Sequence, residues 1–173
     1  MTPGKVLIVY ATGYGSTAEV AEVMAEELRS LDLHVEVQSA DIARTPEENE
    51  AVVIGSVIRY DRWLPAAIHY LNRHQEILGR IPVAYFYTCL ALAAPSSAST
   101  DQTQIYDSKL LDMNPRIKPV MIGGFAGVLD YRPMPWYFRL VLGAIAKVKG
   151  LSAGDYRNWE AIRNWIRQFT NCI

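Results

Sequence analysis

Residues 6–17 read VLIVYATGYGST, and this stretch decides the fold. A run of apolar residues leads directly into a turn with two glycines and several hydroxyl side chains. Apolar residues at helical spacing follow, with glutamates between them. The pattern predicts a buried strand, a Gly-rich loop and the N-terminus of a helix. Because loop amides and the positive end of a helix dipole favour a bound anion, we expect this loop to hold a phosphate group.

The expected phosphate-binding residues are those of the turn itself: Thr12, Gly13, Tyr14, Gly15, Ser16 and Thr17. The turn contains no Lys or Arg, so we expect uncharged donors to hold the anion. Its clustered hydroxyl groups suit a single terminal phosphate better than a nucleoside triphosphate, because no Gly-Lys-Ser/Thr motif follows.

Two other interpretations of the turn stay open. Ser16 and Glu19 have the spacing of a capping box, which stabilises a helix start and needs no ligand. The glycines also fit the G-x-G-x-x-A pattern of dinucleotide-binding folds, which is accompanied by an acidic residue about 20 positions further on. Here Glu36 lies inside the expected second strand and Asp41 comes late, so that match is weak.

Composition limits the function classes. A chain of 173 residues is long enough to form one domain, 1–173, with a core of its own. The formal net charge of −1 gives no electrostatic footprint for nucleic acid. Cys89 and Cys172 have no spacing typical of zinc or redox sites, so no metal is expected. With an N-terminus that lacks the features of a signal peptide, this cysteine usage indicates a cytoplasmic protein.

Strand-like segments alternate with helical segments along the chain. The strands are expected at residues 6–10, 35–37, 51–56, 83–88 and 120–125. Helices are expected after the first turn, from Thr45, from Leu64 to Gly79, and along the stripe Trp159, Ile162, Ile166 and Phe169. Nearly continuous apolar strands that alternate with helices predict an α/β fold, a doubly wound five-stranded parallel sheet covered on both faces.

Ligands of such sheets bind beyond the carboxyl ends of the strands. Small, polar and ring-bearing residues follow the strands, and we expect them to line one crevice with the first turn. The added candidates are Ser56, Val57, Ile58, Arg59, Tyr60, Thr88, Cys89, Leu90, Gly124, Phe125 and Ala126. Tyr60, Trp63 and Phe125 are candidates to stack on a flat aromatic ligand. No catalytic side chain is identified, so a bound cofactor is expected to supply the chemistry.

Two segments exceed what a five-stranded domain requires. Residues 91–104 are mostly small and polar, and we expect a long loop beside the ligand edge. An insert at about 129–150 follows the fifth strand, with apolar residues at helical spacing. Within it, residues 131–149 interleave aromatic and basic side chains, a surface suited to a membrane or a lipophilic quinone. An amphipathic helix packed on the domain is the alternative.

Three stretches carry a resemblance to a known family: IVYATGYGSTAE at 8–19, VIGSVIRY at 53–60 and DYRNWE at 155–160. The chain resembles the flavodoxin-like family along essentially its whole length, and more closely its menaquinone-dependent protoporphyrinogen oxidase branch. The resemblance implies FMN as the cofactor, with its phosphate at 12–17. The isoalloxazine ring would then lie among the other candidate residues named above.

The same resemblance implies the two-electron oxidation of a tetrapyrrole precursor, with electrons passed to menaquinone at the surface of the cytoplasmic membrane. Residues 91–104 depart from that branch, because they contain no basic residue where the bacterial oxidases carry lysines and arginines. The alternative function is a flavodoxin-type electron carrier that docks on redox proteins. Charge complementarity makes such carriers strongly acidic, so the net charge of −1 and the basic insert favour the enzyme. The oligomeric state stays open.

Overall fold

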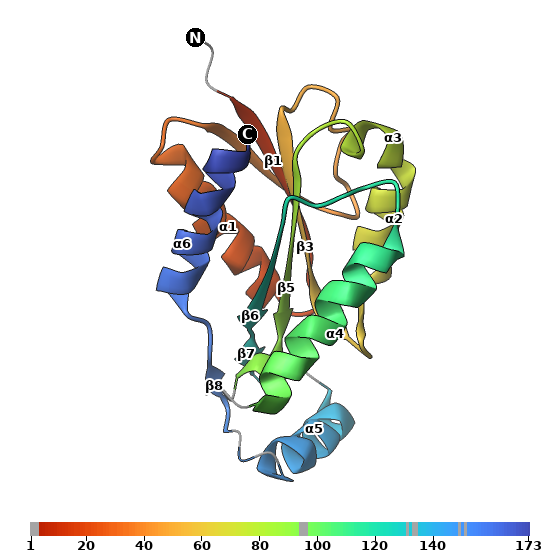
Figure 1. Ribbon diagram of the computed structural model, residues 1–173. Coiled ribbons are helices and arrows are strands. Elements are labelled where there is room, and N and C mark those ends of the chain that lie inside the picture. The colour runs from red at the N-terminus through yellow and green to blue at the C-terminus, as the bar shows by residue number, and fades with distance from the viewer. Residues whose placement is uncertain (1–3, 94–96, 131, 133–134, 149, 151) are drawn as a thin grey trace.

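The computed structural model describes residues 4–93, 97–130, 132, 135–148, 150 and 152–173 (Figure 1). Five parallel strands form its sheet in the order β2-β1-β3-β5-β6. Their bounds are Lys5–Ala11 for β1, His34–Ser39 for β2, Ala51–Arg59 for β3, Val83–Cys89 for β5 and Met121–Ala126 for β6. A short strand, β4 (Arg62–Trp63), pairs antiparallel with the end of β3. The predicted doubly wound five-stranded α/β sheet is confirmed.

Helices cover both faces of this sheet (Figure 1). One layer consists of α1 (Ser16–Arg29) and α6 (Trp159–Phe169), and the other of α2 (Pro65–Arg73), α3 (Gln75–Leu78) and α4 (Ser97–Met113). Short 3-10 turns, Leu90–Leu92 and Thr170–Cys172, follow β5 and α6. Successive strand residues enter two apolar clusters, one under each layer. Because both faces are covered, β1, β3 and β5 are apolar over most of their length.

The order of the strands determines where a ligand can enter. From β1 the chain goes outward to β2 and then returns to β3 on the other side of β1. The strand order therefore changes direction between β1 and β3, and the connections after these strands separate at the carboxyl edge of the sheet. Doubly wound sheets bind their ligands in the crevice at this switch point.

The long loop expected at 91–104 is not present, because α4 begins at Ser97. The neighbouring strands β5 and β6 are parallel, and parallel neighbours need a crossover of a dozen or more residues, usually a helix. Tyr106 and Leu110 lie one turn apart on α4, and both are buried against the sheet. The segment is thus a structural crossover of the fold rather than an added loop.

Two smaller expectations about helices are also wrong. The chain does not form a helix after Thr45; the amide of Asn49 donates to the carbonyl of Pro46 within a turn. The helix expected from 64 to 79 is divided at His74 into α2 and α3.

The insert after β6 is helical, as predicted. Helix α5 (Trp136–Val148) lies in the chain between β7 (Val128–Leu129) and β8 (Gly154–Asp155), and these two strands pair antiparallel outside the main sheet. Figure 1 shows α5 beyond the carboxyl edge of the sheet, apart from both helical layers. Within the described parts of the chain, none of the helices has the length and apolar character needed to cross a membrane.

Candidate functional site

The turn between β1 and α1 has the geometry of an anion-binding loop. Gly15 precedes the helix in a left-handed conformation (φ 97°), which glycine adopts without steric cost. Its amide donates to Oγ1 of Thr12 (2.9 Å), and no side chain caps the first helical turn. The capping-box interpretation is wrong, because the N-cap is Gly15 and not Ser16. The amides at the helix start therefore keep their capacity to bind an anion.

Two of the candidate residues, Thr17 of the turn and Ser56 at the end of β3, make hydroxyl hydrogen bonds inside the protein. Thr17 is buried, and its Oγ1 lies 2.9 Å from Oγ1 of Thr88. Ser56 is buried as well; its hydroxyl accepts from the amide of Leu64 (2.9 Å) and donates to the carbonyl of Val57 (3.0 Å). These bonds join the start of α1 to β5 and the end of β3 to the start of α2. They fix the strand ends that surround the site.

A charged side chain reaches the turn from β3. Arg59 packs on Gly13 so closely that a Cβ built there would lie 2.5 Å from its Nη2. Its guanidinium also faces Tyr14, with Cζ 5.1 Å from the ring centroid. Tyr60 and Asp61 follow with φ of 51° and 59°, and form a two-residue hairpin turn into β4. The turn itself contains no basic residue, and this contact brings a cation to it from a distant part of the sequence; that uncharged donors hold the anion stays a prediction.

A second arginine reaches the turn from the C-terminal part of the chain. Arg157 donates to the carbonyl of Ser16 (3.1 Å) and pairs with Glu19 (2.6 Å) and Asp155 (2.7 Å). Its side chain is 6% exposed, and its Cζ lies over the Trp159 ring, 4.3 Å from the ring centroid. The hydrogen bond from Arg157 lowers the pKa of Asp155. The base of the insert is thus fastened to the start of α1.

These elements enclose a pocket of about 770 Å³ at the carboxyl edge of the sheet. Many of the residues expected at the crevice line it: Gly13, Tyr14, Ser16, Val57, Ile58, Arg59, Tyr60, Thr88, Cys89 and Leu90. They come from the ends of three strands that the fold brings together. The volume is in the range of sites for small molecules and cofactors. Direct contact of these residues with a ligand stays a prediction.

The other candidates are not part of the pocket wall: Thr12, Gly15, Thr17, Ser56, Gly124, Phe125 and Ala126. In β6 the reason is packing. A Cβ built on Gly124 would lie 2.5 Å from Oη of Tyr87. Phe125 is buried against Trp165, with ring centroids 5.6 Å apart. In this part of the chain, the first residue that lines the pocket is Gly127, directly after β6.

Sequence reasoning missed the wall at the base of the insert, together with two residues near the other strand ends. The missed residues are Glu19, Ala91, Val128, Leu129, Asp130, Arg132, Ala153, Gly154, Asp155 and Arg157. Arg132 pairs with Asp130 (2.9 Å) in the same way as Arg157 pairs with Asp155. The Asp-x-Arg spacing therefore occurs at both ends of the insert, and this repeat is the sequence signal that could have located the wall.

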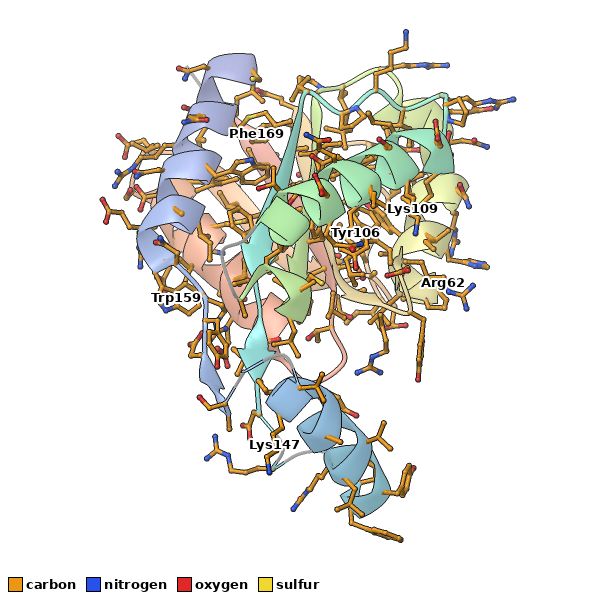
Figure 2. The ribbon with its side chains drawn as sticks, turned by 60° about the horizontal axis from the view of Figure 1, so that its bottom comes forward. Arg62, Tyr106, Lys109, Lys147, Trp159 and Phe169 are labelled. Atoms are coloured by element: carbon orange, nitrogen blue, oxygen red, sulfur yellow. The ribbon has the colours of Figure 1, made fainter. Side chains whose placement is uncertain are left out.

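Behind the pocket wall, a polar network joins Cys89 to the hairpin turn. The thiol of Cys89 donates to Oη of Tyr106 (3.8 Å), and Tyr106 donates to Oδ1 of Asp61 (3.1 Å). Lys109 pairs with the same carboxylate (3.9 Å), and Figure 2 shows both α4 residues on the side of the hairpin. Burial raises the pKa of Tyr106, so its hydroxyl stays protonated at neutral pH.

Of the three aromatic residues expected to stack on a flat ligand, Trp63 and Phe125 are buried and Tyr60 lines the pocket.

Comparison with known proteins agrees with this geometry. The model of the flavodoxin domain family matches residues 7–153. The chain belongs to this family. It is 31% identical over 174 residues to protoporphyrinogen IX dehydrogenase (quinone) of Escherichia coli K12, a match that covers 96% of this chain and 95% of that protein.

Solved structures of the same fold give a second comparison. Oxidised flavodoxin 1 from Bacillus cereus superposes with a TM-score of 0.60 at 17% identity, covering 98% of this chain and 99% of that one. A flavoprotein from Lactobacillus acidophilus NCFM in complex with FMN has a TM-score of 0.54 at 14% identity, covering 70% of this chain and 93% of that one. These likenesses show the flavodoxin fold.

Proposed function

We propose that this chain is an FMN-dependent oxidoreductase that oxidises a tetrapyrrole precursor and passes the electrons to a quinone, for which we expect menaquinone. One observation carries the proposal: a helix start without a side-chain cap opens onto a pocket of about 770 Å³ at the strand ends. The 31% identity to a protoporphyrinogen IX dehydrogenase (quinone), along nearly the whole chain, supports the activity. Membership of the flavodoxin domain family supports the cofactor.

The residues of the pocket fit FMN. The backbone amides at the start of α1 would hold the phosphate, with Thr12 fixing the shape of the turn through its hydrogen bond to Gly15. The walls at 57–58 and 88–91, with Tyr60, would enclose the isoalloxazine ring. When bound, FMN supplies two-electron redox chemistry that side chains lack. The residues of the pocket wall would bind and orient the flavin and limit its contact with water.

The cofactor is tested with a matched pair of variants at Gly15. We expect the purified protein to be yellow and to release FMN on denaturation, measured by absorbance and mass. Gly15→Glu places a carboxylate at the open side of the turn, so FMN retention should be lost. Gly15→Ala brings the same left-handed strain without the charge, and should retain more FMN than Gly15→Glu. Equal FMN content in Gly15→Glu and the unmodified protein would contradict this placement.

The reaction is tested by anaerobic turnover with a reduced tetrapyrrole and a menaquinone analogue. Oxidation of the tetrapyrrole with matching reduction of the quinone is the expected result. Rapid electron exchange with a ferredoxin, without quinone reduction, would instead indicate the flavodoxin-type carrier.

We also propose that α5 brings the pocket to an anionic membrane surface on the cytoplasmic side. Trp136, Leu140 and Val141 on this helix are 73%, 67% and 59% exposed. Residues 131–150 contain four basic and no acidic side chains, although the whole chain has a net charge of −1. A basic helix with an exposed apolar face is typical of interfacial binding to anionic lipid. Residues 131, 133, 134 and 149 of the expected 131–149 surface lie outside the described residues.

Co-sedimentation with vesicles tests this contact. We expect the protein to sediment with vesicles containing anionic lipid, and the double variant Trp136→Ser, Leu140→Ser to stay in the supernatant. Ile105→Ser with Leu111→Ser is the matched control, because both residues are apolar, lie on α4 and are about half exposed (48% and 49%). Unchanged sedimentation of the α5 variant would contradict the membrane contact.

A further inference from the structure

Among the described residues of the pocket wall, one arginine has no carboxylate partner. Three arginines and three carboxylates line the pocket. The carboxylates pair with two of the arginines: Glu19 and Asp155 with Arg157, and Asp130 with Arg132. Among the residues that the structure describes, no carboxylate pairs with Arg59, whose guanidinium faces the Tyr14 ring. A guanidinium inside a partly enclosed wall favours an anion beside it.

The hairpin holds Arg59 at the turn. Arg59 pairs across the hairpin with Arg62, and the next residue, Trp63, is 1% exposed and packs edge-on against Tyr85 at 5.1 Å. This anchor fixes the end of β3 relative to the core. The guanidinium then lies directly over Gly13, where a side chain would occupy its place.

We propose that Arg59 is the cationic partner of the phosphate monoester, and that it makes the pocket select FMN over flavins that lack a phosphate. This inference rests on the FMN site proposed above. A phosphate monoester carries nearly two negative charges at neutral pH, whereas amides and a helix dipole supply only partial charges. A planar guanidinium donates paired hydrogen bonds to phosphate oxygens and supplies a full charge. The turn contains no basic residue, and β3 provides one from the neighbouring strand.

The test compares two flavins that differ only in the phosphate. Flavin is removed from the purified protein, and the affinities for FMN and riboflavin are measured by quenching of flavin fluorescence. Arg59→Gln should weaken FMN binding about 10- to 100-fold and change riboflavin binding by less than about twofold. Arg59→Lys keeps the charge and should fall between the two proteins for FMN.

Arg62→Gln is the matched control. It removes the same charge from the opposite strand of the same hairpin, but Arg62 is exposed and lies on the outer side of the protein (Figure 2). Its affinities for both flavins should equal those of the unmodified protein. Thermal unfolding followed by circular dichroism checks that each variant is folded.

A pH series adds a second readout. The second pKa of a phosphate monoester lies near 6, so FMN affinity should rise as pH increases through this value, and riboflavin affinity should not. The rise should be smaller in Arg59→Gln, because the added charge no longer meets a cation. Equal weakening of both flavins in Arg59→Gln, or unchanged FMN affinity, would overturn this inference alone. An unmodified protein that binds neither flavin would overturn the proposed function as well.

Discussion

Helices α5 and α6 both carry apolar residues at helical spacing, but among the side chains that the structure describes α5 leaves several of the large ones exposed, whereas α6 buries its stripe. On α6, Ile162, Ile166 and Phe169 are completely buried in the cluster that α1 and the sheet share. On α5, Trp136 and Leu140 are 73% and 67% exposed. Figure 2 shows Phe169 on the inner side of α6, and shows α5, which carries Lys147, outside the two helical layers. The same sequence pattern has therefore led to two different environments.

The difference comes from how each helix is attached. α6 returns along the sheet and packs on α1, whereas α5 is held beyond the sheet edge by the β7–β8 pair. Helical periodicity predicts that one face will be covered, but it does not say by what. The apolar face of α6 is covered by α1 and the sheet of the same chain. For α5 we propose that the cover is a membrane surface, and the following substitutions test this contrast in order of decreasing effect.

The largest effect is expected in the buried stripe. Phe169→Ala should reduce the free energy of unfolding by about 3–5 kcal/mol, because it removes a fully buried ring and leaves a cavity. Urea unfolding followed by circular dichroism measures this loss, with Tyr137→Ala on α5 (58% exposed) as the aromatic control. A loss below about 1 kcal/mol for Phe169→Ala would mean that α6 does not depend on its stripe.

The next effect concerns the ion pairs that fasten α6 to α1. Glu27 on α1 is 7% exposed at its side chain, and it accepts from Nε of Arg167 (2.5 Å) and Nη1 of Arg163 (3.3 Å). Glu27→Gln should cost about 2 kcal/mol of unfolding free energy, since charged hydrogen bonds are weakened while both arginines can still reach water. Glu26→Gln is a neighbouring control, because its contact with Arg163 is long (3.9 Å) and exposed.

The stabilisation by Glu27 should also depend on pH. The hydrogen bond from Arg167 lowers the pKa of Glu27 below its ordinary value of 4.5. The stabilisation is therefore complete above the unfolded pKa and is lost as pH falls through the lower folded pKa. The difference in unfolding free energy between the unmodified protein and Glu27→Gln should be constant near neutral pH and shrink below about pH 4.5. A difference that grows on acidification would contradict this account.

A smaller effect is expected at the start of α6. The side chain of Asn158 accepts from the amide of Ala161 (3.0 Å) and caps the helix. Asn158→Ala should cost about 1 kcal/mol, measured by the same urea titration. Asn158→Asp keeps an acceptor at this position and should cost less. Equal losses in the two variants would show that the cap contributes little.

Secondary structure could be predicted from the sequence where an apolar pattern is compatible with only one kind of element. Strands β1, β3 and β5 are apolar over most of their length because both faces of the sheet are covered, so their positions could be predicted; β2 (HVEVQS), at the sheet edge, is mostly polar. Helix α4 was missed because its first half, SASTDQTQ, has no apolar periodicity, and Tyr106 and Leu110 are the large residues that it buries. The need for a crossover between β5 and β6 follows from topology rather than from these residues.

The candidate site also has a part that a local sequence pattern predicts and a part that depends on the tertiary structure. The turn at 12–17 is a local motif, and its backbone geometry could be predicted from two glycines and a helix start. The approach of Arg59 to Gly13 depends on the register of β1 with β3, which pairs Ala11 with Ser56. The wall at the base of the insert depends on the chain's return through β8. The approach of Arg59 cannot be deduced from residues that are neighbours in sequence, and for the wall the repeated Asp-x-Arg spacing is a local signal that does not by itself show how the two ends meet.

The smallest effect on folding, and the sharpest test of the contrast, is expected on α5. Leu140→Ser should change the unfolding free energy by less than about 0.5 kcal/mol, because this side chain is already 67% exposed. Binding to a surface that recognises only the folded state stabilises that state. Anionic vesicles should therefore raise the midpoint of thermal unfolding of the unmodified protein more than that of Leu140→Ser, and neutral vesicles should leave both unchanged. A large loss of stability for Leu140→Ser without vesicles would instead show that the stripe of α5 is covered by its own chain, as on α6.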